Sequence, residues 1–460
     1  MFFQQFKVEG LGCLSYIIGC PQDGRAIVVD PKRDINDYLR AAQINKLRIT
    51  GIIETHVHAD HISGAAELKQ QTGAPIHIGA GSPVDYEHLP LHDGDEIVIG
   101  NAKIRVVATP GHTPNSISLA LTDLVRGDLV EMLLTGDLLF VGSIGRPDLA
   151  GGELMEEQIR NSYHSLKVKL DEFPDYVEVY PAHGAGSLCG AGISAKPSST
   201  LGFERRTNPF LQLDFEDFKD RLHQNTPHRP INFTHIINTN LQGPKLIEEL
   251  PVISEYKPLT CKKFLASDPD KLLIDLREAT AFGGAHIPNS YNIGMAPNSA
   301  TWMGNVVKPE NELLLLANNH QEIEDAATMF RRVGYDNIKG YIIGLSSWIL
   351  AAEETGFLPQ ITVHSLHHVL EKYSNHMILD VRNESEWLGG HIENSEHLPL
   401  PELINRGFNN HLDQHISVIC MSGYRSNIAA SILKQRGYKN VYSVIGGMST
   451  WKAAGYKFDQ

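Results

Sequence analysis

The stretch GIIETHVHADHISG, residues 51–64, decides the fold of the first part of the chain. Its apolar start predicts a strand over 51–54, and its end predicts a helix that begins near Ser63. The turn between them carries three histidines and one aspartate: His56, His58, Asp60 and His61. Imidazole and carboxylate groups bind zinc and iron, so the stretch predicts a metal site at the end of this strand.

Three later segments place further candidate ligands at predicted strand ends. They read TPGHT at 109–113, TGDL at 135–138 and YPAH at 180–183. The candidate ligands in them are His112, Asp137 and His183. A lone histidine is usually an ordinary core or surface residue, but that explanation does not account for the whole ordered set.

Short apolar strands alternate with polar helices over the first 190 residues. Strand patterns fall at 26–29, 103–108 and 132–134, and helical patterns at about 35–47 and about 63–72. Strands interleaved with helices in this way predict a layered α/β domain.

The segment from about 184 to 250 is rich in glycine, serine and proline, and one amphipathic helix is expected at about 214–224. We expect this segment to extend over the first domain and then to become a linker.

The remaining residues contain an internal repeat. LLIDLREATAFGGAHIPNS at 272–290 matches MILDVRNESEWLGGHIENS at 377–395, at an offset of 105 residues. Further on, FRRVGYDNI matches LKQRGYKNV at an offset of 103. Two copies of about 100 residues are too long and too few for a solenoid array, so they predict a pair of duplicated α/β domains.

The last copy places a cysteine at the end of a strand, in SVICMSGYRSN at 417–427. A helix is predicted to begin near Asn427, so Cys420 sits in a loop at a helix N-terminus. Such a loop, together with Arg425, can stabilise an anion and lower the pKa of a thiol. A buried cysteine is more often a small core residue, but the strand–loop–helix position favours a reactive thiol.

These features resemble two known families. The histidine and aspartate set, over residues 1 to about 240, resembles a metallo-β-lactamase-fold domain, which implies two sheets between helices with the metal at the sheet edge. The C-x4-R spacing of Cys420 and Arg425 is one residue shorter than the phosphatase loop and resembles rhodanese. The rhodanese resemblance extends to LDVR at 379–382, GGHI at 389–392 and GGMSTW at 446–451.

The rhodanese resemblance implies that Cys420 carries sulfane sulfur as a persulfide. Arg425 and the loop amides would stabilise the persulfide anion; the residues that supply these amides are Met421, Ser422, Gly423 and Tyr424. In the middle copy, Ala317 replaces the cysteine and Glu322 replaces the arginine. The middle copy is therefore expected to be an inactive rhodanese-like domain.

The metallo-β-lactamase resemblance leaves two reactions open. In a glyoxalase II-like thioesterase, two zinc ions would be held by His56, His58 and His112 and by Asp60, His61 and His183, with Asp137 bridging them. In a persulfide dioxygenase, one Fe(II) per chain would be held by His56, His112 and Asp137. His58, Asp60, His61 and His183 would then orient these ligands and exchange protons.

Local context favours the dioxygenase. The segment GRPD at 145–148 resembles the one that follows the metal-binding aspartate in persulfide dioxygenases, and Arg146 could hold a substrate carboxylate or form a structural pair with Asp148. After His183 the chain reads GAGS, where the stand-alone dioxygenases tend to continue with Asp-Tyr. Arg205 and Arg206 are further candidates for an anionic substrate, with a solvated charge pair as the alternative.

The fusion also favours the dioxygenase, because a dioxygenase and a sulfurtransferase both handle sulfane sulfur. We expect four parts: a metallo-β-lactamase-fold domain at 1–240, a linker at 241–257, an inactive rhodanese-like domain at 258–357 and an active one at 358–460. The order resembles bacterial persulfide dioxygenase–rhodanese fusions of sulfide detoxification. This resemblance implies oxidation of a low-molecular-weight thiol persulfide by O2 to sulfite, and transfer of sulfane sulfur through Cys420 to sulfite, which gives thiosulfate. A sulfurtransferase whose metal domain only binds or relays remains a further alternative.

Composition limits the cellular setting and the partners. The formal net charge of −14 disfavours nucleic acid and anionic membranes as partners. No apolar run of membrane-spanning length and no secretory signal pattern is present, and five cysteines are too few for a disulfide framework. We therefore expect a cytoplasmic enzyme that meets a thiol persulfide, O2 and sulfite. The family resemblance implies a homo-oligomer, a dimer or a tetramer.

Overall fold

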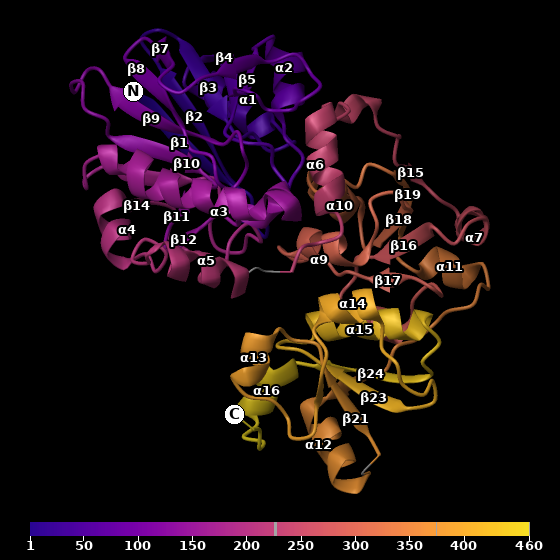
Figure 1. The fold of residues 1–460 in the computed structure, drawn as a ribbon. Coiled ribbons are helices and arrows are strands. Elements are labelled where there is room, and N and C mark those ends of the chain that lie inside the picture. The colour runs from indigo at the N-terminus through magenta and orange to yellow at the C-terminus, as the bar shows by residue number, and fades with distance from the viewer. Residues whose placement is uncertain (225–227, 374, 460) are drawn as a thin grey trace. The chain divides into compact units, whose positions relative to one another are not determined.

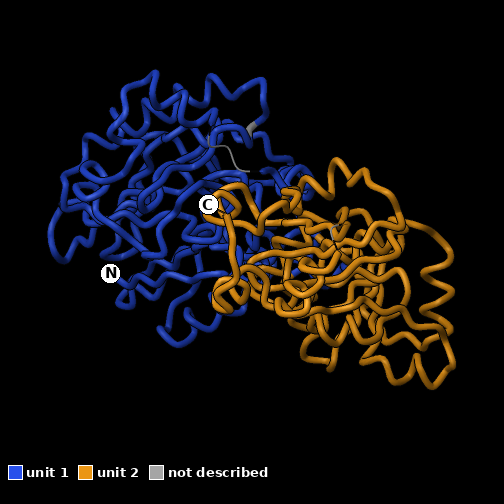
Figure 2. Tube along the Cα trace, turned by 90° about the horizontal axis from the view of Figure 1, so that it is seen from below, with its two compact units in different colours: residues 1–250, 330–334 blue, residues 251–329, 335–460 orange. Residues whose placement is uncertain are grey.

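The computed structural model describes residues 1–224, 228–373 and 375–459 (Figure 1). The chain divides into two compact units, which Figure 2 colours separately. Unit 1 comprises Met1–Leu250 with Phe330–Gly334, and unit 2 comprises Pro251–Met329 with Tyr335–Gln460.

Unit 1 contains two six-stranded sheets. The first has the order β1 (Phe2–Lys7), β2 (Leu14–Cys20), β3 (Arg25–Val29), β4 (Arg48–Glu54), β5 (Ile76–Gly79), β6 (Leu89–Leu91). The second has the order β14 (Ser199–Thr200), β13 (Glu178–Pro181), β10 (Met132–Gly136), β9 (Ile117–Asp123), β8 (Ala102–Ala108), β7 (Glu96–Ile99). A short hairpin joins β11 (Leu139–Phe140) to β12 (Ser143–Ile144).

Helices cover the outer faces of the two sheets. The helices of unit 1 are α1 (Asn36–Ile44), α2 (Ala65–Thr72), α3 (Met155–His164), α4 (Leu201–Thr207), α5 (Phe215–Gln224) and α6 (Phe233–Gln242). Of these, α6 packs beside the turn after β4 instead of on a sheet face. Short helical turns are η1 (Pro147–Ala150), η2 (Gly152–Leu154), η3 (Ser165–Lys169), η4 (Leu170–Glu172) and η5 (Ile247–Glu249). Tyr38 of α1 and Leu68 of α2 share a core with Val28 of the first sheet, while Ile159 of α3 and Phe218 of α5 pack on the second.

Strand periodicity explains why the sheets pack face to face. Successive side chains on a strand point to opposite faces. On β8, Ile104 and Val106 enter the core between the two sheets, whereas Val107 faces the core under α3 and α5. The result is the four-layer αββα sandwich that the sequence predicts.

The segment after His183 differs from the expectation of a single helix at about 214–224. The structure has α5 there, but α4 precedes it and α6 follows it. The sequence obscures α4 because it is only 7 residues long and contains a glycine. It obscures α6 because β-branched and asparagine residues, which are poor helix formers, make up much of FTHIINTNLQ.

Unit 2 contains two five-stranded parallel sheets with the same strand order. The first copy runs β15 (Ser254–Glu255), β19 (Ile338–Ile343), β18 (Glu312–Ala317), β16 (Lys271–Asp275), β17 (Tyr291–Asn292). The second runs β20 (Gln360–Thr362), β24 (Asn440–Ile445), β23 (His415–Ile419), β21 (Met377–Asp380), β22 (Glu396–His397). This shared topology confirms the duplicated α/β fold.

The helices of unit 2 also correspond between the copies. The first copy has α7 (Pro258–Ala266), α8 (Ala279–Gly284), α9 (Ser299–Val306), α10 (His320–Arg332) and α11 (Ser346–Leu350). The second has α12 (Val363–Lys372), α13 (Glu384–Leu388), α14 (Leu400–Arg406), α15 (Tyr424–Gln435) and α16 (Gly447–Ala453). The helix after the cysteine begins at Tyr424, three residues earlier than expected, so Arg425 lies in its first turn.

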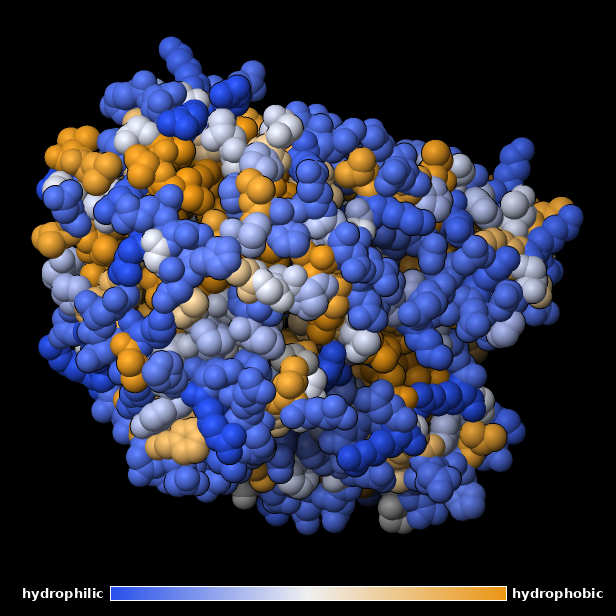
Figure 3. Space-filling view, turned by 45° about the horizontal axis from the view of Figure 1, so that its top comes forward, coloured by the Kyte–Doolittle hydropathy of each residue, from blue (hydrophilic) through white to orange (hydrophobic). Residues whose placement is uncertain are grey.

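The surface is mostly polar on the face that Figure 3 shows, with apolar side chains scattered in small groups. Within the described residues, no helix is long and apolar enough to cross a bilayer.

Candidate functional site

Four strand ends bring the predicted ligands together in unit 1. In the second sheet, β8 and β10 both run antiparallel to β9, and β13 runs parallel to β10. The carboxyl ends of β8, β10 and β13 therefore lie at the same edge of the sheet. His112, Asp137 and His183 follow these ends, and the 55–61 turn follows β4 of the facing sheet.

His56, His112 and Asp137 form one group of buried ligand atoms. Three atoms, one from each residue, lie within 4.8 Å of one another. Asp137 Oδ2 is 3.7 Å from His56 Nε2 and 3.4 Å from His112 Nε2. All three atoms are buried without a hydrogen-bond partner among the described residues. Buried polar atoms are normally satisfied, so this convergence fits a metal ion.

The protonation states of this group also suit a metal. His112 Nδ1 donates to the carbonyl of Arg146 at 2.8 Å, which leaves a lone pair on Nε2. Burial lowers the pKa of His56 and of His112, so both imidazoles are neutral near pH 7. Burial disfavours the charge on Asp137, but the adjacent imidazoles outweigh it and lower the pKa of this carboxyl. Two neutral imidazoles and a carboxylate are a set of groups that could hold a transition-metal ion.

Asp60, His61 and His183 form a second group together with Cys13. His183 bridges two carboxylates, with Nδ1 2.6 Å from Asp137 Oδ1 and Nε2 2.7 Å from Asp60 Oδ2. Asp60 Oδ2 also accepts the thiol of Cys13 at 3.3 Å, and His61 Nδ1 lies 3.1 Å from Asp60 Oδ1. Hydrogen bonds within the group therefore occupy most of its polar atoms. Of the four ring nitrogens of His61 and His183, Nε2 of His61 is the one without a partner among the described residues.

His58 turns toward two carboxylates. Its Nε2 lies 3.2 Å from Asp30 Oδ1 and 3.0 Å from Glu54 Oε2. Burial disfavours the charged ring, but these two carboxylates outweigh it and raise the pKa of His58 well above its usual value. His58 is therefore not part of the group formed by His56, His112 and Asp137. The other ring nitrogen of His58, Nδ1, has no partner among the described residues.

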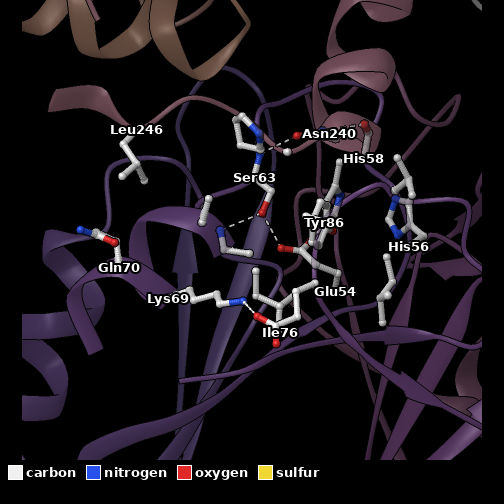
Figure 4. Close-up of a pocket in the computed structure, with 17 residues that line it drawn as sticks. Glu54, His56, His58, Ser63, Lys69, Gln70, Ile76, Tyr86, Asn240 and Leu246 are labelled. Carbon is white, nitrogen blue, oxygen red and sulfur yellow. Dashed lines mark hydrogen bonds and ion pairs between the residues drawn. The ribbon is translucent and has the colours of Figure 1, made fainter. Parts of the chain in front are cut away.

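A cavity of about 280 Å³ adjoins this arrangement on the side of α2. Figure 4 shows Glu54, His56, His58 and Tyr86 around it, with the Ser63 hydroxyl directed at Glu54. Asn240 of α6 closes the cavity from the other side and donates to the carbonyls of His58 and His61 at 2.9 and 2.8 Å. The helix that the sequence obscured therefore fixes the histidine turn.

The three arginine candidates bind other protein groups. Arg146 makes two 2.7 Å hydrogen bonds to Asp148. This is the structural pair that we gave as the alternative to binding a substrate carboxylate. Arg205 binds Asp175 at 2.6 Å and two backbone carbonyls, and Arg206 binds Asp175 at 3.0 Å. Asp175 belongs to neither ligand group, so the structure does not bring Arg205 or Arg206 to the metal cluster.

In unit 2, Cys420 follows β23 and is buried. Of the four predicted loop amides, that of Gly423 makes a hydrogen bond to Sγ of Cys420, at 3.1 Å. Gly423 has a φ of 108°, which glycine adopts without strain. Tyr424 directs its hydroxyl away from the thiol, to the carbonyl of Gly294 in the first copy at 2.8 Å.

Arg425 is paired with a residue that the sequence reasoning missed. Its two terminal nitrogens each lie 2.6 Å from a carboxylate oxygen of Glu386. Glu386 also accepts the amide of Asn383, which caps α13 in a reciprocal capping box. The NESE segment at 383–386 carries the signal of such a box, but no sequence pattern links it to Arg425.

In the first copy, the loop that corresponds to the Cys420 loop makes hydrogen bonds to the carboxylate of Glu322. Glu322 accepts the backbone amide of Asn318 at 2.8 Å and the side-chain amide of Asn319 at 2.9 Å. Ala317 stands at the end of β18, where Cys420 follows β23 in the second copy. Ala317 and Glu322, which replace Cys420 and Arg425, thus lie in the loop of the first copy that corresponds to the Cys420 loop.

Other residues were missed because only the fold brings them to the cluster. Asp30 follows β3, Cys13 precedes β2, and Cys189 forms a buried group with Asp137 and His183. The neighbours of Cys13 and Cys189 in the sequence carry no signal of a site.

Comparisons with known proteins identify the families that the chain resembles. The model of the metallo-beta-lactamase superfamily matches residues 8–183, and that of the rhodanese-like domain matches 259–351 and 362–454. The mitochondrial persulfide dioxygenase ETHE1 of Homo sapiens is 31% identical over 217 residues, which cover 46% of this chain and 76% of that protein. The same enzyme of Bos taurus is 31% identical over 210 residues, covering 44% and 73%.

A crystal structure of a metallo-beta-lactamase from Staphylococcus aureus is 32% identical, with a TM-score of 0.67. The match covers 75% of this chain and 99% of that one, and so extends beyond unit 1. The chain belongs to the metallo-beta-lactamase superfamily, with a first domain similar to ETHE1 followed by two rhodanese-like domains.

Proposed function

We propose that the chain is a persulfide dioxygenase fused to a sulfurtransferase. The first domain oxidises a low-molecular-weight thiol persulfide: RSSH + O2 + H2O gives RSH + SO3²⁻ + 2 H⁺. Cys420 then passes sulfane sulfur to sulfite: Cys–S–S⁻ + SO3²⁻ gives Cys–S⁻ + S2O3²⁻. The product of the first site is thus the acceptor at the second.

One observation carries the proposal for the first site. The atoms that lack partners are those of His56, His112 and Asp137, whereas the residues of the second group largely satisfy one another. This contrast favours one metal ion over two. His56, His112 and Asp137 would hold Fe(II), which would supply the redox chemistry for the reaction of the persulfide with O2.

The surrounding residues have positioning roles in this proposal. His183 holds Oδ1 of Asp137 through its Nδ1–H and so leaves Oδ2 as the atom that could bind a metal. The carbonyl of Arg146 fixes the ring of His112. Partners of this kind orient ligands and tune their basicity.

At the second site, the thiolate of Cys420 is the sulfur carrier. The amide of Gly423 donates to Sγ and the N-terminus of α15 faces the loop, and both favour an anion there. Arg425 adds positive charge next to this loop, although Glu386 engages it in the structure.

Metal analysis of anaerobically purified protein, together with oxygen consumption on glutathione persulfide, tests the first half. We expect about one iron per chain, as three ligands for one ion imply, and oxygen uptake that produces sulfite. Two zinc ions per chain with no oxygen uptake on any thiol persulfide would overturn it.

The second candidate function is a dinuclear thioester hydrolase. The observation that favours it is the second group, in which Asp60, His61 and His183 lie close together and His61 Nε2 is unpaired among the described residues. Hydrolysis of S-lactoylglutathione by the zinc-loaded protein distinguishes this function from the first.

A further inference from the structure

The two rhodanese-like copies of unit 2 pack against each other next to the Cys420 loop. α15 contacts β17, and α14 contacts α9 (Figure 1). Phe282 of the first copy lies in the hydrophobic core that also contains Cys420 and Leu379 of the second. The copy that lacks the cysteine therefore helps to build the surroundings of the one that has it.

Specific hydrogen bonds tie the loop itself to the first copy. The hydroxyl of Tyr424 donates to the carbonyl of Gly294 at 2.8 Å and lies 3.2 Å from the hydroxyl of Ser299. One turn further along α15, the side-chain amide of Asn427 donates to Asn292. These contacts hold the first copy against the start of α15.

A cavity of about 260 Å³ lies at this junction, and we call it the junction pocket. Its lining from the first copy includes Glu278, Thr280, Asn292 and Gly294, and its lining from the second includes Gln360, Ser422, Gly423 and Tyr424. Gly423 is the residue whose amide binds Sγ of Cys420, so the pocket and the thiol share one loop.

The junction pocket contains one carboxylate, and its side-chain amide donors are already hydrogen-bonded. The amide NH2 groups of Asn292 and Gln360 are already used, in bonds to backbone carbonyls and to Asn427. Glu278 is exposed, makes no ion pair among the described residues and makes no capping bond to α8. No lysine, arginine or histidine lines the pocket. It thus offers one uncommitted negative charge.

We propose that the junction pocket binds the organic part of the thiol persulfide that loads Cys420, and that Glu278 selects donors with an ammonium group. This rests on the proposed role of Cys420 as the sulfur carrier. The thiolate of Cys420 attacks the outer sulfur of RS–SH, the new S–S bond forms at Sγ, the old S–S bond breaks, and RS⁻ leaves with its electron pair. The copy without a cysteine then acts as the half of the site that recognises the donor.

Binding of two sulfur-inert probes to the full chain tests the pocket without chemistry. The probes are S-methylcysteamine and 2-(methylthio)ethanol, which differ in having an ammonium or a hydroxyl group. Ligand-observed NMR titration gives both Kd values. We expect the ammonium probe to bind about two- to fivefold more tightly, the range of an exposed ion pair. Glu278→Gln should abolish the preference, whereas the control Glu324→Gln, at an exposed position on α10, should keep it.

Kinetics of sulfur transfer to cyanide complete the test, with cysteamine persulfide and 2-mercaptoethanol persulfide as donors. Glu278→Gln should raise KM for the amine donor about two- to fivefold with kcat unchanged. Equal affinity of the probes, or a preference that survives in Glu278→Gln, would overturn the pocket assignment. Sulfur transfer that persists in Cys420→Ser would instead refute the carrier role, and the probe titrations distinguish the two failures.

Discussion

At the scale of single residues, His112 offers the clearest test of the metal group. Its Nε2 is one of the three unpaired ligand atoms, so His112→Ala removes a ligand without breaking a hydrogen bond of that atom. We expect bound iron and oxygen uptake to fall together, by more than the 10- to 100-fold typical of residues that only orient ligands. Iron per chain after anaerobic dialysis and oxygen uptake are the measurements.

The matched control is His92→Ala, because His92 is an exposed histidine that lies beside Asp95. This variant should keep both iron and oxygen uptake. Full uptake in His112→Ala would show that the assignment of this ligand is wrong.

Glu386 provides a second test at this scale. Burial of Glu386 disfavours its charge, but hydrogen bonds and charge from Arg425 outweigh this and lower its pKa. The pair is therefore complete above pH about 4.3, the ordinary value for glutamate, and its contribution is lost as the pH falls through the lowered pKa of Glu386. Near neutral pH the carboxylate holds Arg425 in place.

Glu386→Gln weakens this pair and leaves Arg425 freer to face Cys420. We expect iodoacetamide to alkylate Cys420 several-fold faster near neutral pH, because a nearby cation stabilises the thiolate that attacks. Alkylation rates on the Cys420 peptide, followed by mass spectrometry across pH, measure this change. The double variant Glu386→Gln/Arg425→Gln should reverse the effect, and an unchanged alkylation profile in the single variant would contradict this role of Glu386.

The residue scale also shows what the sequence can predict of the sites. The seven metal-site candidates follow strands, so strand order alone brings them to one edge of the sandwich. The spacing of the residues does not predict where their side chains point. His58 turns to Asp30, which follows β3, and to Glu54, the last residue of β4. Likewise, Arg425 meets Glu386 across the fold of the second copy, at a separation of 39 residues.

At the scale of elements, a buried ion pair supports the strand–turn–helix segment in each copy. Arg382 binds Asp380 and donates to the carbonyls of Glu386 and Gly390, and neither side chain of the pair is exposed. Arg277 and Asp275 form the equivalent pair in the first copy.

Arg382→Met leaves Asp380 in the core without its guanidinium partner. Breaking a buried pair costs about 3–5 kcal/mol, so we expect faster backbone hydrogen exchange in 377–398 and loss of sulfur transfer. Arg277→Met is the matched variant, and its increase in exchange should centre on 272–293 instead. Unchanged exchange at 377–398 in Arg382→Met would show that the pair does not support this segment. Mass spectrometry of peptic peptides resolves the two segments.

The helices and strands also show which parts of the fold the sequence predicts and which it does not. The strands β3, β8 and β10 agree with their predicted ranges within two residues. β3 and β10 are apolar runs buried on both faces, and β8 alternates over most of its length, so each leaves a clear pattern in the sequence. The helices α4 and α6 leave weak patterns, and tertiary contacts stabilise them. Asn240 illustrates this, because its amide binds backbone carbonyls of the histidine turn.

At the scale of the whole molecule, the proposed function divides two reactions between two sites in one chain. The metal group lies in unit 1 and Cys420 lies in unit 2, and the described residues of each site come from its own unit. Cys420→Ser removes the sulfur carrier but leaves all ligands of the metal group in place. We therefore expect oxygen uptake on glutathione persulfide to continue at the rate of the unchanged protein.

The product should change, because sulfite would then have no persulfide carrier to accept sulfur from. We expect sulfite to accumulate in Cys420→Ser where the unchanged protein yields thiosulfate, and monobromobimane labelling with chromatography separates the two. Cys261→Ser, at a buried thiol in the first copy, is the control that should keep thiosulfate as the product. Equal loss of oxygen uptake in Cys420→Ser would mean that the two sites do not act separately, since a change in unit 2 would then control the chemistry in unit 1.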